Sequence, residues 1–172
     1  MGTASISIDL RYDPLAYRGS GRKEKRMGKL ERYEPGTFGW GDLTTADPVS
    51  VKTFYGELFG WEAEEMPAGE AGTYTMLSLE GDEVCGFYEM EAEGREGSIS
   101  SRWFSYVSIE DTDATASRTH KLGDTVYGGE AFNVLDSGRM AVIQDPTCAV
   151  LAAWAPWAHI GADRVNDPSC LT

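Results

Sequence analysis

The sequence predicts an α+β domain in which two copies of one β-α-β-β-β module form a concave, mixed but mostly antiparallel sheet. In the first module a strand precedes Asp47, and a helix then runs to Gly60. The second module repeats this order from Arg102, with a helix that starts after Asp111 and ends near Gly123. The offset from Asp47 to Asp111 is 64 residues, which is typical of a duplicated supersecondary unit. Two such copies predict one domain made of two halves.

The first half begins with the clearest local signals. A strand is predicted within residues 38–46, and a helix from Pro48 to Phe59. Asp47 is a suitable N-cap, proline is favoured at the first helical position, and Gly60 follows the last turn. We expect the apolar stripe of this helix, spaced i, i+3, i+4 and i+7, to be buried. Its members are Val51, Phe54, Tyr55 and Leu58.

Short apolar or alternating runs between Gly, Pro and Asp residues predict the other elements. The first half continues with strands at Trp61–Met66, Thr73–Leu79 and Glu83–Met90. The second half has a strand at Trp103–Ile109, a helix near Asp113–Leu122, and strands at Val126–Phe132, Arg139–Gln144 and Val150–Ala155. Near the N-terminus, Ile6 and Ile8 alternate with polar residues and indicate one further short strand.

Composition limits the class of protein. The chain has 172 residues, 41% of them hydrophobic, and a mean hydropathy of −0.35, which predicts one domain with a sizeable core. No apolar run approaches the roughly 20 residues of a membrane helix, and no signal-peptide core precedes the domain. We therefore expect a cytoplasmic protein with no membrane partner. Cys85, Cys148 and Cys170 lack CxxC spacing and are expected to be reduced thiols.

Charge divides the chain near residue 35. Residues 1–35 hold eight Lys and Arg against five Asp and Glu, whereas the rest holds seven against 23, for a net charge of −13. A domain this acidic repels phosphate backbones, which argues against a nucleic-acid partner. We expect residues 1–34 to be an unassigned N-terminal extension, residues 35–157 to be the domain, and residues 158–172 to be a tail or a linker to an absent second domain.

Four stretches in this order resemble the vicinal oxygen chelate superfamily, which includes glyoxalase I, extradiol dioxygenases, and fosfomycin- and bleomycin-resistance proteins. The stretches are Trp40 to Leu43, Phe54 to Trp61, Asp136 to Ala141, and Asp145-Pro146. The resemblance covers about residues 35–161 and is greatest to glyoxalase-like antigens with two such domains in tandem. There, a segment like His159 to Ala162 leads into the second domain. Because the pocket of single-domain relatives lies at a dimer interface, the resemblance implies a homodimer.

The resemblance also implies where a metal would bind. Metal-dependent members take ligands from three strand positions, found here by counting seven residues from the aspartates that flank each strand. Those positions hold Trp40, Phe104 and Ala152, none of which binds metals. The two histidines, His120 and His159, are expected to be solvated or hydrogen-bonded. We therefore expect no bound metal and no cofactor.

If these strand positions face the concave side, the two-residue period of a strand adds their i+2 neighbours to the same face. The candidate ligand-binding residues are then Trp40, Asp42, Phe104, Tyr106, Ala152 and Trp154. Such an aromatic wall with one acid and one phenol suits a planar aromatic or apolar small molecule. The alternative is that these aromatic residues are ordinary sheet core, and the sequence leaves both interpretations open.

Two residues near the last strands have local interpretations. Arg139 is interpreted as a clamp of its loop, or as a partner of Asp136 or of an anionic ligand. Cys148 stands where proteins of the superfamily usually have glycine, which bears on the geometry of the turn after Asp145.

Four functions follow from this sequence. The first is a metal-independent small-molecule binding protein of the glyoxalase/bleomycin-resistance type. The second is a lyase, isomerase or hydrolase of the same fold that uses Asp42 or Tyr106 as its acid or base. A metal-dependent glyoxalase I or dioxygenase is a weaker alternative, because the ligand positions carry other residues. The fourth is a dimerising structural module without a ligand.

Overall fold

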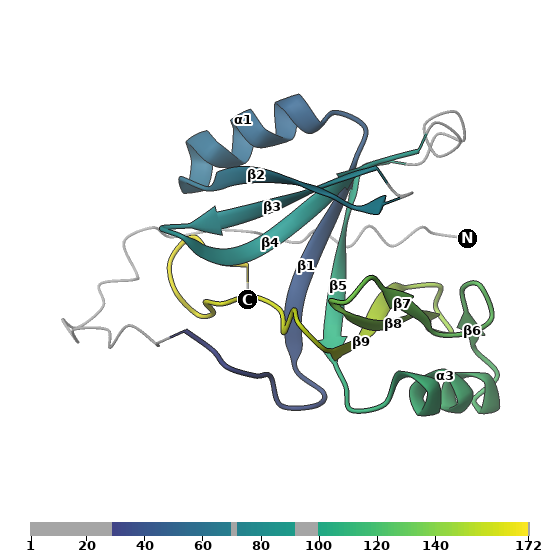
Figure 1. The fold of residues 1–172 in the computed structure, drawn as a ribbon. Helices are drawn as coiled ribbons and strands as arrows, with labels where there is room; N and C mark the ends of the chain where they lie inside the picture. The colour runs from purple at the N-terminus through teal and green to yellow at the C-terminus, as the bar shows by residue number, and fades with distance from the viewer. Residues whose placement is uncertain (1–28, 70–71, 92–99, 172) are drawn as a thin grey trace, which may run out of the picture.

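The computed structural model describes residues 29–69, 72–91 and 100–171. Within them one sheet has the strand order β2-β3-β4-β1-β5-β9-β8-β6, with β7 beside β8, and it curls into a half-barrel with two helices (Figure 1). The elements are β1 (Phe38–Thr45), α1 (Pro48–Phe59), β2 (Glu62–Pro67), β3 (Thr73–Leu79), β4 (Asp82–Glu89), β5 (Arg102–Ser108), α3 (Thr112–Lys121), β6 (Thr125–Val126), β7 (Phe132–Val134), β8 (Gly138–Gln144) and β9 (Val150–Pro156). The strand suggested at Ile6 and Ile8 lies outside the described residues.

The sheet confirms the two-module fold. β1 and β5, the first strands of the two halves, pair antiparallel at its centre. Each is flanked by the last strand of its own half in parallel, β4 beside β1 and β9 beside β5. The other pairings are antiparallel, as expected. No helix in the described ranges is long and apolar enough to cross a membrane.

The predicted strand Val126–Phe132 was wrong. Its residues form two short strands, β6 and β7, with a turn between them (Figure 1). Gly128 and Gly129 in this turn have φ angles of 76° and 82°, which only glycine adopts without strain. The amide of Gly129 also donates to the carbonyl of Val126 at 2.9 Å. Two consecutive left-handed residues end the extended chain.

Helix α1 has the predicted bounds but not the predicted buried face. The Asp47 carboxylate accepts from the Ser50 amide at 3.0 Å, and Gly60 ends the helix with a φ of 75°. The residues that pack on the sheet are spaced i, i+4 and i+8: Val51, Tyr55 and Phe59. Phe54 and Leu58 are instead 57% and 55% exposed. The apolar stripe of the helix is wider than the area that contacts the sheet. The Tyr55 ring stacks on the Trp61 ring, with 5.3 Å between ring centroids, and this contact turns the Val51–Tyr55–Phe59 side of the stripe toward the sheet.

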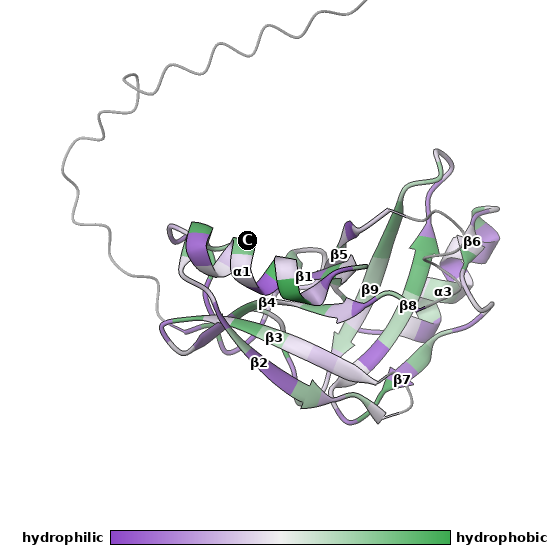
Figure 2. Ribbon diagram, turned by 90° about the horizontal axis from the view of Figure 1, so that it is seen from above, coloured by the Kyte–Doolittle hydropathy of each residue, from purple (hydrophilic) through white to green (hydrophobic). Residues whose placement is uncertain are grey.

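The helices cover one face of the sheet, and each covers its own core. Under α1 the buried residues are Leu43, Trp61, Leu77, Val84, Cys85 and Phe87. Under α3 they are smaller: Ala116, Val126, Ala131, Ala141 and Ala153. β8 and β9 are largely apolar, whereas the edge strand β2 is mainly hydrophilic (Figure 2). Charged residues on an edge strand discourage pairing with another sheet.

The C-terminal segment, residues 157–171, packs on the domain. From the end of β9 it passes β1 and reaches the β3–β4 turn (Figure 1). The Ala162 amide donates to the Gly39 carbonyl at 2.8 Å, and the Arg164 guanidinium donates to Asp82 Oδ2 at 2.7 Å. Residues before β1 join this contact, because the Tyr33 hydroxyl donates to the Ala162 carbonyl at 2.7 Å. The segment therefore covers part of the face opposite the helices.

Candidate functional site

The six candidate residues lie on one face of three adjacent strands, opposite the helices. Residues paired across neighbouring strands point to the same side of a sheet. Trp40 pairs with Tyr106, and Asp42 pairs with Phe104. On the other side of β5, Tyr106 pairs with Ala152, and Ser108 pairs with Trp154. This concave face therefore joins the central strands of both halves.

The centre of this face is the carboxylate of Asp42, which accepts three side-chain hydrogen bonds. Trp40 Nε1 donates to Oδ1 at 2.8 Å, and the Tyr74 hydroxyl donates to the same oxygen. The Tyr106 hydroxyl donates to Oδ2 at 2.6 Å. Trp40 Nε1 also lies 3.1 Å from the Tyr74 oxygen. We call these four residues, Trp40, Asp42, Tyr74 and Tyr106, the Asp42 network.

Burial controls the protonation of this network. Asp42 is 4% exposed, and burial raises the pKa of its carboxyl, although the bonds from Tyr106, Tyr74 and Trp40 partly offset this rise. Burial and the adjacent Asp42 carboxylate raise the pKa of both phenols well above their ordinary value. Tyr74 and Tyr106 therefore keep their protons at neutral pH and act as donors to Asp42.

Aromatic rings continue from this network across the concave face. The Tyr106 ring makes edge-on contacts with two other rings. Its centroid lies 5.7 Å from the centroid of Phe104 and 6.0 Å from that of Trp154. The His159 ring contacts Trp40 at 4.5 Å and Trp154 at 6.3 Å. Trp40, Ala152 and Trp154 are buried, whereas Phe104 and Tyr106 are half-buried. Phe104, Tyr74 and Tyr106 are therefore the partly exposed rings of this face, and both tyrosines also pack against the buried cluster of Trp40, Met76, Ala162 and Val165.

Sequence reasoning missed two side chains of this face. Tyr74 lies in a correctly predicted strand, and its alternation with Met76 could have placed both residues on the same face. Its contact with Asp42 could not be predicted, because it depends on the register of β3 and β1 on either side of β4. His159 is half-buried, with a side chain that is 22% exposed, and its Nδ1 lies 3.5 Å from Glu83 Oε2. Only the path of the C-terminal segment brings it to Trp40.

Gly86 makes room for Tyr74. It pairs with Asp42 on one side and with Met76 on the other. A Cβ atom at this position would overlap the Tyr74 hydroxyl and ring. The glycine therefore permits the hydroxyl to reach the carboxylate.

The face does not fit a metal ion. The three strand positions implied by the sequence resemblance carry an indole, a phenyl ring and a methyl group, in Trp40, Phe104 and Ala152. Within the described ranges, no group of three or more His, Cys, Asp and Glu side chains could hold a metal. Asp42 is the carboxylate at the centre, and its three donors leave it poorly suited to coordinate a divalent cation.

Arg139 is a structural clamp and does not pair with Asp136. Its guanidinium makes two bonds to the Asp113 carboxylate, at 2.9 and 2.7 Å. It also donates to Asn133 Oδ1 at 2.6 Å and to the Ala131 carbonyl at 3.0 Å. These contacts tie α3 to the β6–β7 region and occupy the guanidinium.

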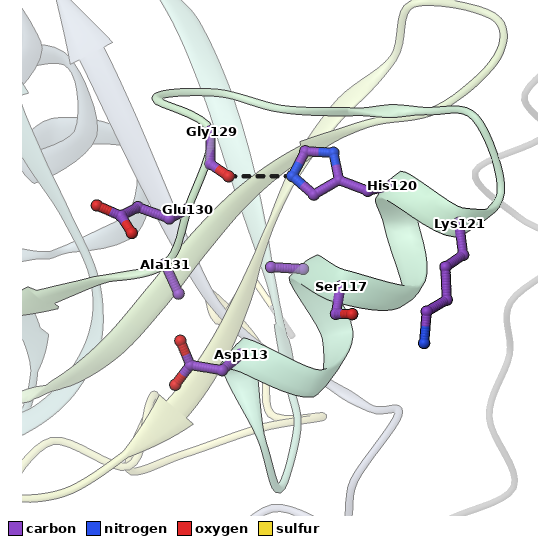
Figure 3. A pocket seen from close by; sticks show the side chains of 8 residues that line it. Asp113, Ser117, His120, Lys121, Gly129, Glu130 and Ala131 are labelled. Carbon is purple, nitrogen blue, oxygen red and sulfur yellow. Dashed lines mark hydrogen bonds between the residues drawn. The ribbon is translucent and has the colours of Figure 1, made fainter.

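A separate hollow of about 450 Å³ lies between α3 and residues 129–131. Its walls carry Asp113, Ala116, Ser117, His120, Lys121, Gly129, Glu130 and Ala131 (Figure 3). His120 Nε2 lies 3.0 Å from the Gly129 carbonyl, as the dashed line in Figure 3 shows. None of the six candidate residues lines this hollow. Because its polar side chains are exposed and partly used by Arg139, the chemistry favours the concave face.

No family model matches the chain. The chain is 37% identical over 146 residues to CFP32 of Mycobacterium bovis, a protein provisionally named a glyoxylase, and the match covers 84% of this chain and 55% of CFP32. It is 30% identical over 152 residues to DnrV of Streptomyces peucetius, which is named an anthracycline biosynthesis protein. This match covers 83% of this chain and 55% of DnrV. The chain thus spans about half the length of these curated relatives.

Solved structures share the fold at low sequence identity. Methylmalonyl-CoA epimerase of Mycobacterium tuberculosis has a TM-score of 0.55 and 14% identity, over 74% of this chain and 91% of the epimerase. The Mn(II)-bound glyoxalase of Novosphingobium aromaticivorans has a TM-score of 0.50 and 12% identity, over 77% of this chain and 42% of the glyoxalase. At such identities the likeness shows a common fold.

Proposed function

Because this chain belongs to the vicinal oxygen chelate superfamily of glyoxalase-like proteins, we propose that it binds a planar aromatic small molecule on its concave face without a metal. The observation that carries this proposal is the ring series Phe104, Tyr106 and Trp154, with spacings of 5.7 and 6.0 Å, built around one buried carboxylate. Aromatic faces of this kind stack on flat ligands.

One of the relatives, DnrV, is compatible with this ligand class. DnrV is named for anthracycline biosynthesis, and anthracyclines contain fused planar rings. The Asp42 network supports binding over metal chemistry, because its carboxylate is committed to three neutral donors. In this proposal Asp42 fixes the orientation of Tyr74 and Tyr106, and the rings provide most of the contact area.

Tryptophan fluorescence tests the proposal directly, because Trp40 and Trp154 belong to the face. A naphthalene probe, 2-naphthol, should quench the emission saturably. Phe104→Ala should weaken its binding at least about fivefold, since one stacked ring contributes about 1 kcal/mol beyond its buried area. Phe54→Ala is the matched control, because Phe54 lies on α1 and is 57% exposed. Equal effects of the two substitutions, or no saturable quenching, would contradict the proposal.

An enzyme that uses Asp42 or Tyr106 as its acid or base is the second candidate. It is favoured by the raised pKa of Asp42, because a carboxyl that titrates nearer neutrality is a better proton carrier. NMR of a bound probe over time separates the two functions. Chemical conversion that is lost in Asp42→Asn with affinity retained would support the enzyme, whereas an unchanged probe in the wild-type protein would support a binding protein.

A homodimer and a cytoplasmic location complete the proposal. The first rests on the sequence resemblance, and the second rests on Cys85, Cys148 and Cys170, which are free thiols, as is usual in a reducing compartment. Sedimentation equilibrium tests the first, because a dimer would have twice the 18.8 kDa mass of the chain. Cell fractionation of the full chain tests the second.

A further inference from the structure

The hydrogen atoms of the Asp42 network are already committed. Trp40 Nε1 and the Tyr74 hydroxyl donate to Oδ1, and the Tyr106 hydroxyl donates to Oδ2. A tyrosine hydroxyl has one hydrogen and two lone pairs. Each phenol therefore points its proton at the carboxylate, and its remaining capacity is to accept.

Tyr106 keeps more of this accepting capacity than Tyr74. The oxygen of Tyr74 lies 3.1 Å from Trp40 Nε1, which takes up one of its lone pairs. The Tyr106 oxygen has no such second contact among the described residues, and its side chain is half-buried. A group that meets the face here must donate a hydrogen bond, because an acceptor would face lone pairs and a carboxylate.

The other end of β5 carries a positive charge, on Arg102. Arg102 is on the concave face of β5, four residues before Tyr106, and pairs with Thr44. Four residues of strand span about 13 Å. Arg102 is exposed and makes no ion pair with the described part of the chain, unlike Arg139 and Arg164. Phe104 lies between Arg102 and Tyr106 on the same face.

From this arrangement we propose that the concave face selects an aromatic ligand with polarity along its length: a hydrogen-bond donor, such as a hydroxyl, at the Tyr106 end and an anionic group at the Arg102 end. This inference rests on the proposed function, because it assumes that the ring of the ligand stacks near Phe104. It assigns a role in specificity to Arg102, which the sequence did not indicate.

Three naphthalenes test this polarity with the ring held constant. The probes are 2-methoxynaphthalene, 2-naphthol and 6-hydroxy-2-naphthoate. Affinity should rise about five- to tenfold from the methoxy compound to the naphthol, because one donor is gained. It should rise again, about three- to tenfold, for the hydroxynaphthoate, and this second gain should fall as salt is added.

Two substitutions should remove the two gains separately. Tyr106→Phe should abolish the advantage of naphthol over methoxynaphthalene but keep the gain from the carboxylate. Arg102→Gln should do the reverse, and because Arg102 is exposed it should leave the melting temperature unchanged. Arg118→Gln is the matched control: it changes the net charge equally, but Arg118 lies on the exposed side of α3.

The possible results distinguish the proposed polarity of the ligand from the proposed binding of an aromatic molecule. Equal affinity of wild-type protein for all three probes would overturn the polarity and leave aromatic binding intact. An equal loss of the carboxylate gain in Arg102→Gln and Arg118→Gln would also overturn it, since a general charge effect would then suffice. Failure of every probe to bind would overturn the proposed function and the inference together.

Discussion

The Tyr106 hydroxyl donates to Asp42 Oδ2 at 2.6 Å, and the two residues are 64 positions apart in the chain. This is the same offset that separates Asp47 from Asp111, the N-caps of the two helices. Asp42 and Tyr106 are therefore equivalent positions of the two modules. The duplicated strands meet at the centre of the sheet, and one copy supplies the acceptor while the other supplies the donor.

Tyr106→Phe should lower the free energy of unfolding by about 2 kcal/mol, because Asp42 Oδ2 would lose a donor in a buried place. Urea denaturation measures this change. Tyr127→Phe is the control, since Tyr127 is 45% exposed, and it should change the value by less than about 0.5 kcal/mol. Similar losses for both tyrosines would contradict a special role for the bond.

Asp42→Asn should change how stability depends on pH. Burial raises the pKa of Asp42 in the folded protein above its ordinary value of 3.8, so the folded state takes up this proton first as pH falls. The carboxyl therefore supports stability fully below its unfolded pKa, and this support is lost as pH rises through the folded pKa. The stability difference between wild type and Asp42→Asn should therefore be largest below the ordinary pKa of 3.8 and should shrink as pH rises above it.

Paired denaturation curves at several pH values measure that difference. Asp47, Asp113 and Asp145 have lowered pKa values and contribute in the opposite direction. Because they are the same in both proteins, their contributions cancel in the comparison. A difference that is constant with pH would mean that Asp42 titrates in the folded protein as it does in the unfolded chain.

Gly86→Ala should displace Tyr74 from Asp42, because the added methyl group would overlap the tyrosine hydroxyl. We expect a loss of about 1–3 kcal/mol of unfolding free energy, as for other overpacked sites. Gly41→Ala is the matched control, since its Cβ would meet Leu171 at an ordinary 3.5 Å. Thermal melts of both variants give the comparison, and equal melting temperatures would argue against the proposed tight contact.

Cys148→Gly should stabilise the protein by about 0.5–1 kcal/mol, because left-handed backbone strains every residue with a Cβ. Cys148 has a φ of 71° in the turn where Asp145 Oδ1 accepts from the Thr147 and Ala149 amides. Cys148→Ala keeps the Cβ and should leave the melting temperature nearly unchanged. A gain of equal size in the alanine variant would assign the effect to the thiol group.

Local sequence patterns were enough to predict the two modules, the bounds of α1 and the strand Thr73–Leu79. Caps, prolines and two-residue alternation act between near neighbours, so these features can be read locally. The same alternation placed Trp40 with Asp42 and Phe104 with Tyr106, and the repeat made them neighbours in the sheet.

The distant residues that complete the concave face depend on how the folded chain packs. Tyr74 reaches Asp42 through the register of β3, β4 and β1, and His159 reaches Trp40 through the path of the C-terminal segment. Phe54 is exposed for a similar reason, because α1 packs on Trp61 with another side of the helix. Register, docking and chain path depend on packing between residues far apart in sequence, and no local pattern encodes them.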